Sequence, residues 1–317
     1  MLRRMVEDHS LGREFLSLQK TQAGKVKDNM KISVFYDHIL QAAEQTGKPL
    51  PALLHEAREA GIEAVEMRLS CFLENEAVLE LLKEAGLSVS CLYEFYEMEK
   101  GLASPMEERH VLAAAQAGAE RILVVPGFLA RQEAEARKAC AGSEEETAAY
   151  MEQSGSVCHM AERLAEMTAL GRKYGVTVTV EDFDDAASPL NGMYGIRWFL
   201  ERVPGLKFTL DMGNFAHAGE DVLAAAALLE PYIAHVHCKN RGEEPSLQKQ
   251  GGINKGLLPV AVGDGYIPIG MMVKELIKKG YNGYFAIEHF DAPNQEESIL
   301  RSAAYLKRIA QEAVAEV

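Results

Sequence analysis

Eight short apolar runs alternate with longer amphipathic runs along this chain of 317 residues, and this alternation limits its fold more than any other feature. The runs that predict strands are 31–36, 62–68, 87–93, 121–126, 176–181, 206–211, 232–237 and 284–288. The runs that predict helices are about 50–59, 75–85, 105–117, 156–173, 192–202, 219–229, 269–278 and 294–314. Strict alternation implies a parallel sheet, and eight units are the number that closes a barrel. We therefore predict an α/β fold, a single-domain (β/α)8 (TIM) barrel over residues 31–317.

An open doubly wound sheet is the alternative, and the lack of a Gly-rich phosphate motif after the first run disfavours it. Two stretches break the alternation. Residues 128–150 are charged and Ala-rich, which predicts a helical insertion, and residues 239–268 are Gly-rich without a helical pattern, which predicts a functional loop. Residues 1–30 carry no strand signal, so we expect an N-terminal extension there, as a helix or a flexible arm.

Composition argues against several classes of function. The formal net charge of −14 argues against a nucleic-acid partner, which requires a basic surface. The five cysteines are widely spaced, without a CxxC pair, as is typical of reduced thiols in the cytosol. No apolar run reaches the roughly 20 residues that span a membrane, and the charged N-terminus lacks the apolar core of a secretory signal. We predict a cytoplasmic protein without a membrane partner.

The last four apolar runs each end in a residue that can bind a metal: Glu181, Asp211, His237 and Glu288. An unpaired charge at the end of a buried strand is costly, so these residues need an explanation. Together they form a mixed oxygen and nitrogen set suited to one divalent cation. In a parallel barrel the carboxyl ends of all strands meet on one face, so residues far apart in the sequence converge there.

The alternation of side chains along each strand supports this interpretation. In the run that ends at Glu181, the valines fall on one face and suit the helix-packed outside, which directs Glu181 inward. The same alternation turns the other three candidates inward and His289 outward. Each residue alone has an ordinary explanation, such as a turn at Asp211. We expect His235 to pack beside the site rather than to bind the metal.

The order Glu, Asp, His, Glu at the ends of strands 5 to 8 resembles the xylose-isomerase-like barrel superfamily, which contains sugar phosphate isomerases and epimerases. The resemblance covers residues 31–314 and includes the phrases 61–66, 210–214, 235–239, 262–265 and 287–288. It implies that the four residues bind one divalent ion, most plausibly Mn²⁺, with Mg²⁺, Co²⁺ and Zn²⁺ as alternatives.

Some positions depart from the pattern of particular members. Asn214 stands where ketose 3-epimerases typically carry a His, and Glu243 stands where they carry an Arg. The early strand ends offer no His, although the multi-metal AP endonucleases need such ligands.

The resemblance also implies a chemistry. Glu181 and Glu288 would serve as base and acid and move a proton at a carbon next to a carbonyl, through an enediolate, while Asp211 and His237 mainly hold the metal. Candidate substrate-binding residues are Lys239, Arg241, Asn214, Arg68 and His38. The aromatic residues Tyr36, Tyr93 and Phe128, together with His38, are candidates for a wall on which a sugar ring packs.

Three functions remain open at this point. The first is a metal-dependent isomerase or epimerase of a sugar or sugar phosphate. The second is a lyase on the same scaffold, either an inosose-type dehydratase or the catalytic subunit of a C-glycoside-cleaving enzyme. The third is a non-catalytic or partner-dependent barrel. The expected partner is a small carbohydrate or polyol, and a homo-oligomer is left open.

Overall fold

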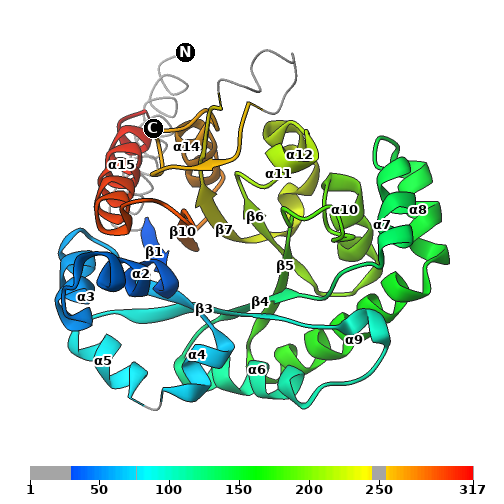
Figure 1. Cartoon of the computed structure of the whole chain (residues 1–317), viewed down its shortest axis with the longest axis horizontal. Coiled ribbons are helices and arrows are strands. Elements are labelled where there is room, and N and C mark those ends of the chain that lie inside the picture. Colours follow the sequence, from blue (N-terminus) through cyan, green and yellow to red (C-terminus); the bar gives the residue numbers. More distant parts are fainter. Residues whose placement is uncertain (1–29, 76, 245–254, 317) are drawn as a thin grey trace, which may run out of the picture.

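The computed structural model describes residues 30–75, 77–244 and 255–316. Eight parallel strands close a barrel in the order β1-β10-β7-β6-β5-β4-β3-β2 (Figure 1). Their bounds are β1 Lys31–Phe35, β2 Ala64–Arg68, β3 Ser88–Phe95, β4 Arg121–Val125, β5 Thr177–Glu181, β6 Lys207–Asp211, β7 Ile233–Lys239 and β10 Tyr284–Glu288. The predicted (β/α)8 barrel is confirmed, and the open sheet is excluded.

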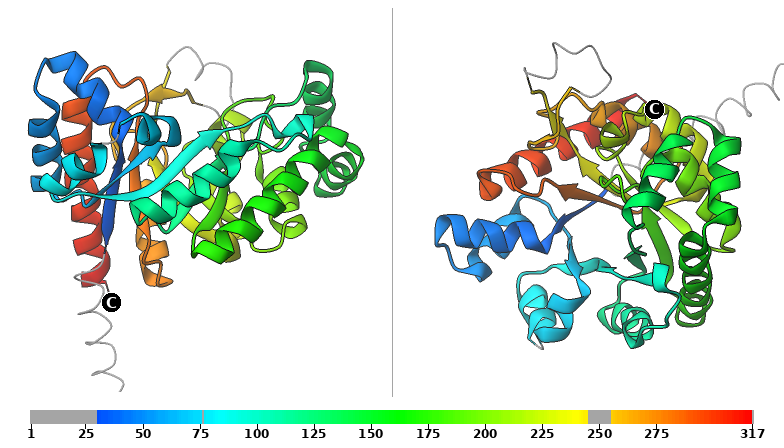
Figure 2. Two further views of the ribbon diagram at one scale, coloured as in Figure 1. Left: turned by 90° about the horizontal axis from the view of Figure 1, so that it is seen from below. Right: turned by 45° about the vertical axis from the view of Figure 1, so that its right-hand side comes forward.

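Helices surround the strands on the outside in all three views (Figures 1 and 2). Their bounds are α2 Tyr36–Thr46, α3 Leu50–Glu59, α4 Leu69–Glu74, α5 Val78–Glu84, α6 Pro105–Ala117, α7 Arg131–Ala139, α8 Glu144–Gln153, α9 Gly155–Tyr174, α10 Met193–Arg202, α11 Phe215–Ala218, α12 Val222–Leu229, α14 Ile269–Lys278 and α15 Gln295–Ala315. Two 3₁₀ turns, Met98–Lys100 and Glu230–Tyr232, complete the layer.

Local sequence signals define several helix ends. Helix α6 begins at Ser104, whose side chain accepts from the Met106 backbone N–H, while Glu107 accepts from the Ser104 backbone N–H. It ends at Gly118, whose φ of 71° is a left-handed conformation that glycine adopts without strain. The sequence predicted this helix correctly, as it did α3 and α14.

Helix α2 was missed by the sequence prediction. It starts directly where β1 ends, and its N-cap residue, Phe35, makes no side-chain capping bond. The stretch expected to be a helical insertion contains α7 and α8. The glycine-rich stretch after β7 contains a two-residue antiparallel pair, β8 (Arg241–Gly242) with β9 (Leu258–Pro259). The predicted N-terminal extension and residues 245–254 lie outside the described residues.

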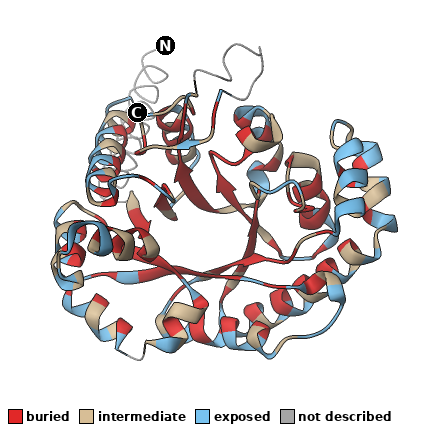
Figure 3. Cartoon of the chain, in the orientation of Figure 1, coloured by how far each residue is buried: buried red, intermediate tan, exposed pale blue. Residues whose placement is uncertain are grey.

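The main core lies between the strands and the helices. The strands are almost wholly buried, whereas the helices bury one face and expose the other (Figure 3). The barrel interior is more polar. There the Thr209 hydroxyl donates to the Thr179 hydroxyl at 2.8 Å, and Thr179 donates to the Ile122 carbonyl. The polar interior matters because it holds the candidate site. Among the described residues, no helix is long and apolar enough to cross a membrane.

Candidate metal centre

The four side chains singled out in the sequence meet at one end of the barrel. Glu181, Asp211, His237 and Glu288 each offer a ligand atom, and these atoms all lie within 4.8 Å of one another. Strand register explains the convergence, because Asp211 pairs with His237 and the neighbouring strand β10 ends at Glu288. All four residues are buried, with Asp211 wholly inaccessible.

One nitrogen of His237 faces all three carboxylates. Its Nδ1 lies 3.1 Å from a Glu181 oxygen, 3.0 Å from Glu288 Oε2 and 3.9 Å from Asp211 Oδ2. The other ring nitrogen, Nε2, lies 3.2 Å from Glu66 Oε2. An imidazole nitrogen carries at most one proton, so it can neutralise at most one of the three carboxylates that surround Nδ1.

These residues fit a divalent cation. Asp211 Oδ2 is buried and has no hydrogen-bond partner among the described residues, although a buried carboxylate oxygen without a partner is costly. Glu181 and Glu288 share the single nitrogen Nδ1 of His237. A cation among the four side chains would satisfy these oxygens and offset the repulsion between the carboxylates. Three carboxylates and one imidazole form a donor set for a borderline-to-hard ion such as Mn²⁺.

The environments of the carboxylates differ. Burial raises the pKa of Asp211 well above its usual value, with Glu288 and Glu181 adding to the rise and Lys239 opposing it. Burial also raises the pKa of Glu181, and His237 only partly offsets this. Burial disfavours the charged form of Glu288 too, yet Lys239 and His237 hold its pKa well below the usual value.

The imidazole of His237 responds to the same charges. Burial favours its neutral form, but Glu66 and the hydrogen bonds with Glu181 and Glu288 raise its pKa well above the ordinary value. A bound cation would therefore displace a proton from this ring.

Two further cations and one carboxylate form a network beside the four side chains. Lys239 Nζ lies 2.8 Å from Glu288 and 3.3 Å from Asp184, and Arg241 Nη2 donates to Asp184 at 2.6 Å. Both cations are buried, with 7% of each residue exposed, while the Asp184 side chain is 29% exposed. The charges of Lys239 and Arg241, which the sequence suggested as substrate contacts, are thus already matched by carboxylates.

The side chains of Asn214 and His38, which the sequence suggested as substrate contacts, form hydrogen bonds within the protein. The side chain of Asn214 donates to the Asp182 carbonyl and accepts from Arg241, so its polar atoms bind the protein itself. His38 is fully buried, accepts from the His289 backbone N–H and stacks on the His289 ring at 4.6 Å. The substrate-binding role predicted for these two residues stays a prediction.

Arg68 lies at the end of β2, and its side chain is 47% exposed. Its Nε donates to Glu94 at 2.9 Å, and its guanidinium lies over the Phe95 ring. Of the predicted substrate contacts it is the most exposed.

Aromatic rings form a continuous chain of edge and tilted contacts near the carboxyl ends of the strands. The Phe35 ring contacts His237 edge-on at 5.0 Å, which ties this chain to the four-residue set. Of the aromatic residues that the sequence suggested, Tyr93 and Phe128 belong to this chain of rings, whereas Tyr36 lies in the main core. The linked rings are Phe290, Phe35, Tyr93, Phe95, Phe183 and Phe128.

Sequence reasoning assigned no role to Glu66, Asp182 or Asp184. Glu66 carried the same signal as the four, a carboxylate inside an apolar strand, but it stands in mid-strand rather than at the end. Asp182 accepts from the Asp211 backbone N–H at 3.1 Å. The run Glu181-Asp-Phe-Asp184 places three acidic residues at one strand end, and this pattern could have indicated Asp182 and Asp184.

The chain is a closed parallel barrel with a buried Glu, Asp, His and Glu set at its carboxyl end that could hold a metal ion. The chain belongs to the xylose isomerase-like TIM barrel family, whose model matches residues 54–309.

Known proteins of similar sequence or structure include several enzymes. The rhizopine catabolism protein MocC of Rhizobium meliloti is 26% identical over 262 residues, covering 78% of this chain and 76% of that protein. The 3-keto-D-glucoside 4-epimerase YcjR of E. coli superposes with a TM-score of 0.62 at 18% identity, covering 88% of this chain and 99% of that one. The probable 3-DHS dehydratase AsbF of Bacillus anthracis gives a TM-score of 0.61 at 18% identity, covering 87% and 98%.

Proposed function

We propose that this protein is a divalent-metal-dependent isomerase or epimerase that moves a proton at a carbon next to the carbonyl of a sugar. The observation that carries the proposal is the set of two glutamates, one aspartate and one histidine whose ligand atoms lie within 4.8 Å of one another. The proposal is supported by family membership and by an epimerase among proteins of similar fold.

The roles of the residues follow from their environments. Glu181, Asp211, His237 and Glu288 would hold the cation. A bound divalent cation polarises a substrate carbonyl and makes the neighbouring C–H more acidic. Glu288 would accept the proton, which leaves an enediolate. Glu181, which like Glu288 contacts His237 Nδ1, would return a proton.

The network around Asp184 bears on the substrate class. Asp184 pairs with both Lys239 and Arg241, and Lys239 also pairs with Glu288, so the two cations are matched by two carboxylates. A phosphate group would compete with Asp184 for these cations. We therefore favour an unphosphorylated sugar or polyol, and a sugar phosphate is the alternative. The aromatic chain would supply the apolar surface on which a sugar ring packs.

A lyase is the second candidate function. The similarity to a probable 3-DHS dehydratase and to a rhizopine catabolism protein favours it. Elimination begins with the same proton removal and then expels a leaving group from the adjacent carbon, so Glu288 would act in the same way. A non-catalytic or partner-dependent barrel is the third candidate, and nothing specific favours it.

The proposal also includes the identity of the ion, the location of the protein in the cell and its oligomeric state. Mn²⁺ suits the mixed ligands, with Mg²⁺, Co²⁺ and Zn²⁺ as alternatives. All five cysteines are free, in keeping with a cytoplasmic location. A homo-oligomer of this chain is part of the same hypothesis.

Two measurements test the function. Metal analysis of the purified protein is expected to find one divalent ion per chain, and chelation is expected to abolish turnover that Mn²⁺ restores. Incubation with ketoses and keto-polyols in heavy water is expected to place deuterium next to the carbonyl. A dehydrated product would select the lyase. A metal-free protein that binds neither Mn²⁺ nor any of these compounds would contradict both.

A further inference from the structure

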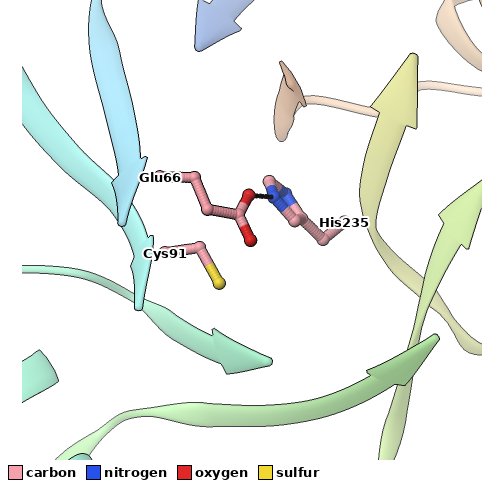
Figure 4. A group of neighbouring side chains, drawn as sticks. All are labelled: Glu66, Cys91 and His235. Atoms are coloured by element: carbon pink, nitrogen blue, oxygen red, sulfur yellow. Dashed lines mark hydrogen bonds and ion pairs between the residues drawn. The ribbon is translucent and has the colours of Figure 1, made fainter. Parts of the chain in front are cut away.

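One carboxylate binds both imidazoles of strand β7. Glu66 Oε2 accepts from His235 Nε2 at 2.7 Å, and the Glu66 oxygens lie 3.2 and 3.3 Å from His237 Nε2. Glu66 comes from β2, on the opposite wall of the barrel, and points across the interior toward His235 (Figure 4). Glu66 and His235 are completely buried. His235 stands two residues before His237, so this contact lies one layer deeper than the four-residue set.

Cys91 lies beside the same carboxylate, and Glu66, Cys91 and His235 together have the residue types of a second metal site. Their hydrogen bonds argue against an ion there. Glu66 is already bonded to two rings, and the Cys91 thiol donates to the Leu92 carbonyl at 3.4 Å. Two of the three residues, Glu66 and Cys91, are therefore bonded within the protein, and only the His235 Nδ1 atom of the set has no partner among the described residues.

The pairing of the strands is irregular at this cluster. The pairing of β2 with β3 shifts between Val65 and Glu66, so that Glu66 is opposite Cys91 and Ser90 is skipped. The pairing of β6 with β7 shifts between Phe208 and Thr209, so that Thr209 is opposite His235. Such irregularities re-aim side chains and are frequent near functional sites. Cys91 and His235 each follow a residue that the strand pairing skips. The position of each side chain in the cluster is therefore set by the backbone.

The hydrogen bonds determine where each ring carries its proton. An ionised carboxylate only accepts, so a ring that faces Glu66 must present an N–H at Nε2. For His237 this leaves Nδ1, the atom that faces Glu181, Asp211 and Glu288, to bind an ion through its lone pair. A metal-binding histidine commonly donates its other N–H to a carboxylate, which fixes its tautomer and orientation.

We propose that Glu66 is the positioning residue of the metal site, holding His237 through Nε2 so that Nδ1 binds the ion, with His235 as the second donor that anchors Glu66. This inference rests on the metal site of the proposed function.

The variant Glu66→Gln tests the proposal. Its amide removes the negative charge that both rings face, and it replaces one of the two carboxylate oxygens near His237 Nε2 with an NH2 group that cannot accept a hydrogen bond, so the hold on the His237 ring weakens. We expect Mn²⁺ affinity, measured by calorimetry, to fall by about 10- to 100-fold, the usual cost of removing such a partner. A mainly structural role would lower the melting temperature and leave the affinity unchanged.

A matched control separates these two roles. Glu107 is also a buried glutamate, but its partner is Arg163, on α9. Glu107→Gln makes the same chemical change away from the site, and we expect it to reduce stability while Mn²⁺ affinity stays within twofold of wild type. Equal affinities for wild type and Glu66→Gln would overturn the proposal. No divalent binding by the wild type would instead overturn the metal site itself.

A measurement on the unaltered protein decides the matter if Glu66→Gln does not fold. In wild-type protein loaded with Zn²⁺, ¹⁵N spectra of the histidines are expected to show His237 protonated at Nε2 and metal-bound at Nδ1. They are expected to show His235 protonated at Nε2 as well. Metal binding through Nε2 of His237 would refute the role assigned to Glu66.

Discussion

His110 provides a test of the structure that does not depend on the proposed function. The ring is fully buried on α6, where Nε2 lies 3.1 Å from the Leu92 carbonyl and Nδ1 lies 3.0 Å from the Tyr96 hydroxyl. The carbonyl can only accept, so Nε2 carries the proton and Nδ1 accepts from Tyr96. Burial lowers the pKa of His110 from 6.5 to about 4, against the raising effects of the Leu92 hydrogen bond and Glu94.

The sign of the effect on stability follows from this shift. Below pH 6.5 the unfolded chain takes up a proton at this ring while the folded protein does not, so stability falls as the pH drops through 6.5 toward 4. At about 1.4 kcal/mol per pKa unit, His110 is expected to cost about 3 kcal/mol between pH 7 and pH 4.

Urea unfolding of wild type and His110→Gln at both pH values measures this cost. Glutamine can donate to the Leu92 carbonyl and accept from Tyr96 but does not titrate. The wild type should therefore lose about 3 kcal/mol more than the variant over this range. The exposed His55, replaced by Gln, is the control and should behave as wild type. Parallel pH profiles for wild type and His110→Gln would refute the reasoning.

Three further predictions concern the site. Asp211→Ala is expected to abolish Mn²⁺ binding in equilibrium dialysis with an unchanged circular dichroism spectrum; retained one-to-one binding would contradict the ligand set. Glu288→Gln keeps an oxygen ligand but removes the base, so turnover should fall by about 10²- to 10⁴-fold while substrate binding changes little, and near-normal turnover would exclude this role. Asp184→Asn should release Lys239 and Arg241 and raise kcat/KM for a phosphorylated sugar relative to its unphosphorylated form; an unchanged ratio would argue against the network as a determinant of specificity.

The sequence predicted the barrel because its signal is periodic and repeated. Each strand is an apolar run, and helices such as α6 have polar caps and a terminal glycine. Helix α2 escaped prediction because it has no such signal at its start and follows β1 without a turn. Strand β7 runs to Lys239, two residues beyond the predicted end, since Lys239 pairs with Glu288 across the sheet and is buried by that contact.

The convergence of Glu181, Asp211, His237 and Glu288 could be predicted because parallel strands bring their carboxyl ends together. Contacts across the barrel could not be predicted. The alternation turns Glu66 inward, but strand pairing does not reveal which residue it meets on the opposite wall. The pairing of Asp184 with Lys239 likewise depends on the path of a loop, which follows no period.

The contact between Glu66 and His237 has a consequence for the ancestry and dissection of this barrel. All four proposed ligands come from β5 to β10, so a C-terminal half-barrel would contain the complete proposed set. Under the proposal above, the orientation of His237 nevertheless depends on Glu66 of β2, in the other half. Co-expressed half-barrel fragments should therefore regain tight metal binding only when they assemble. A duplication of the C-terminal half alone would retain every ligand and still lack the residue that orients the histidine.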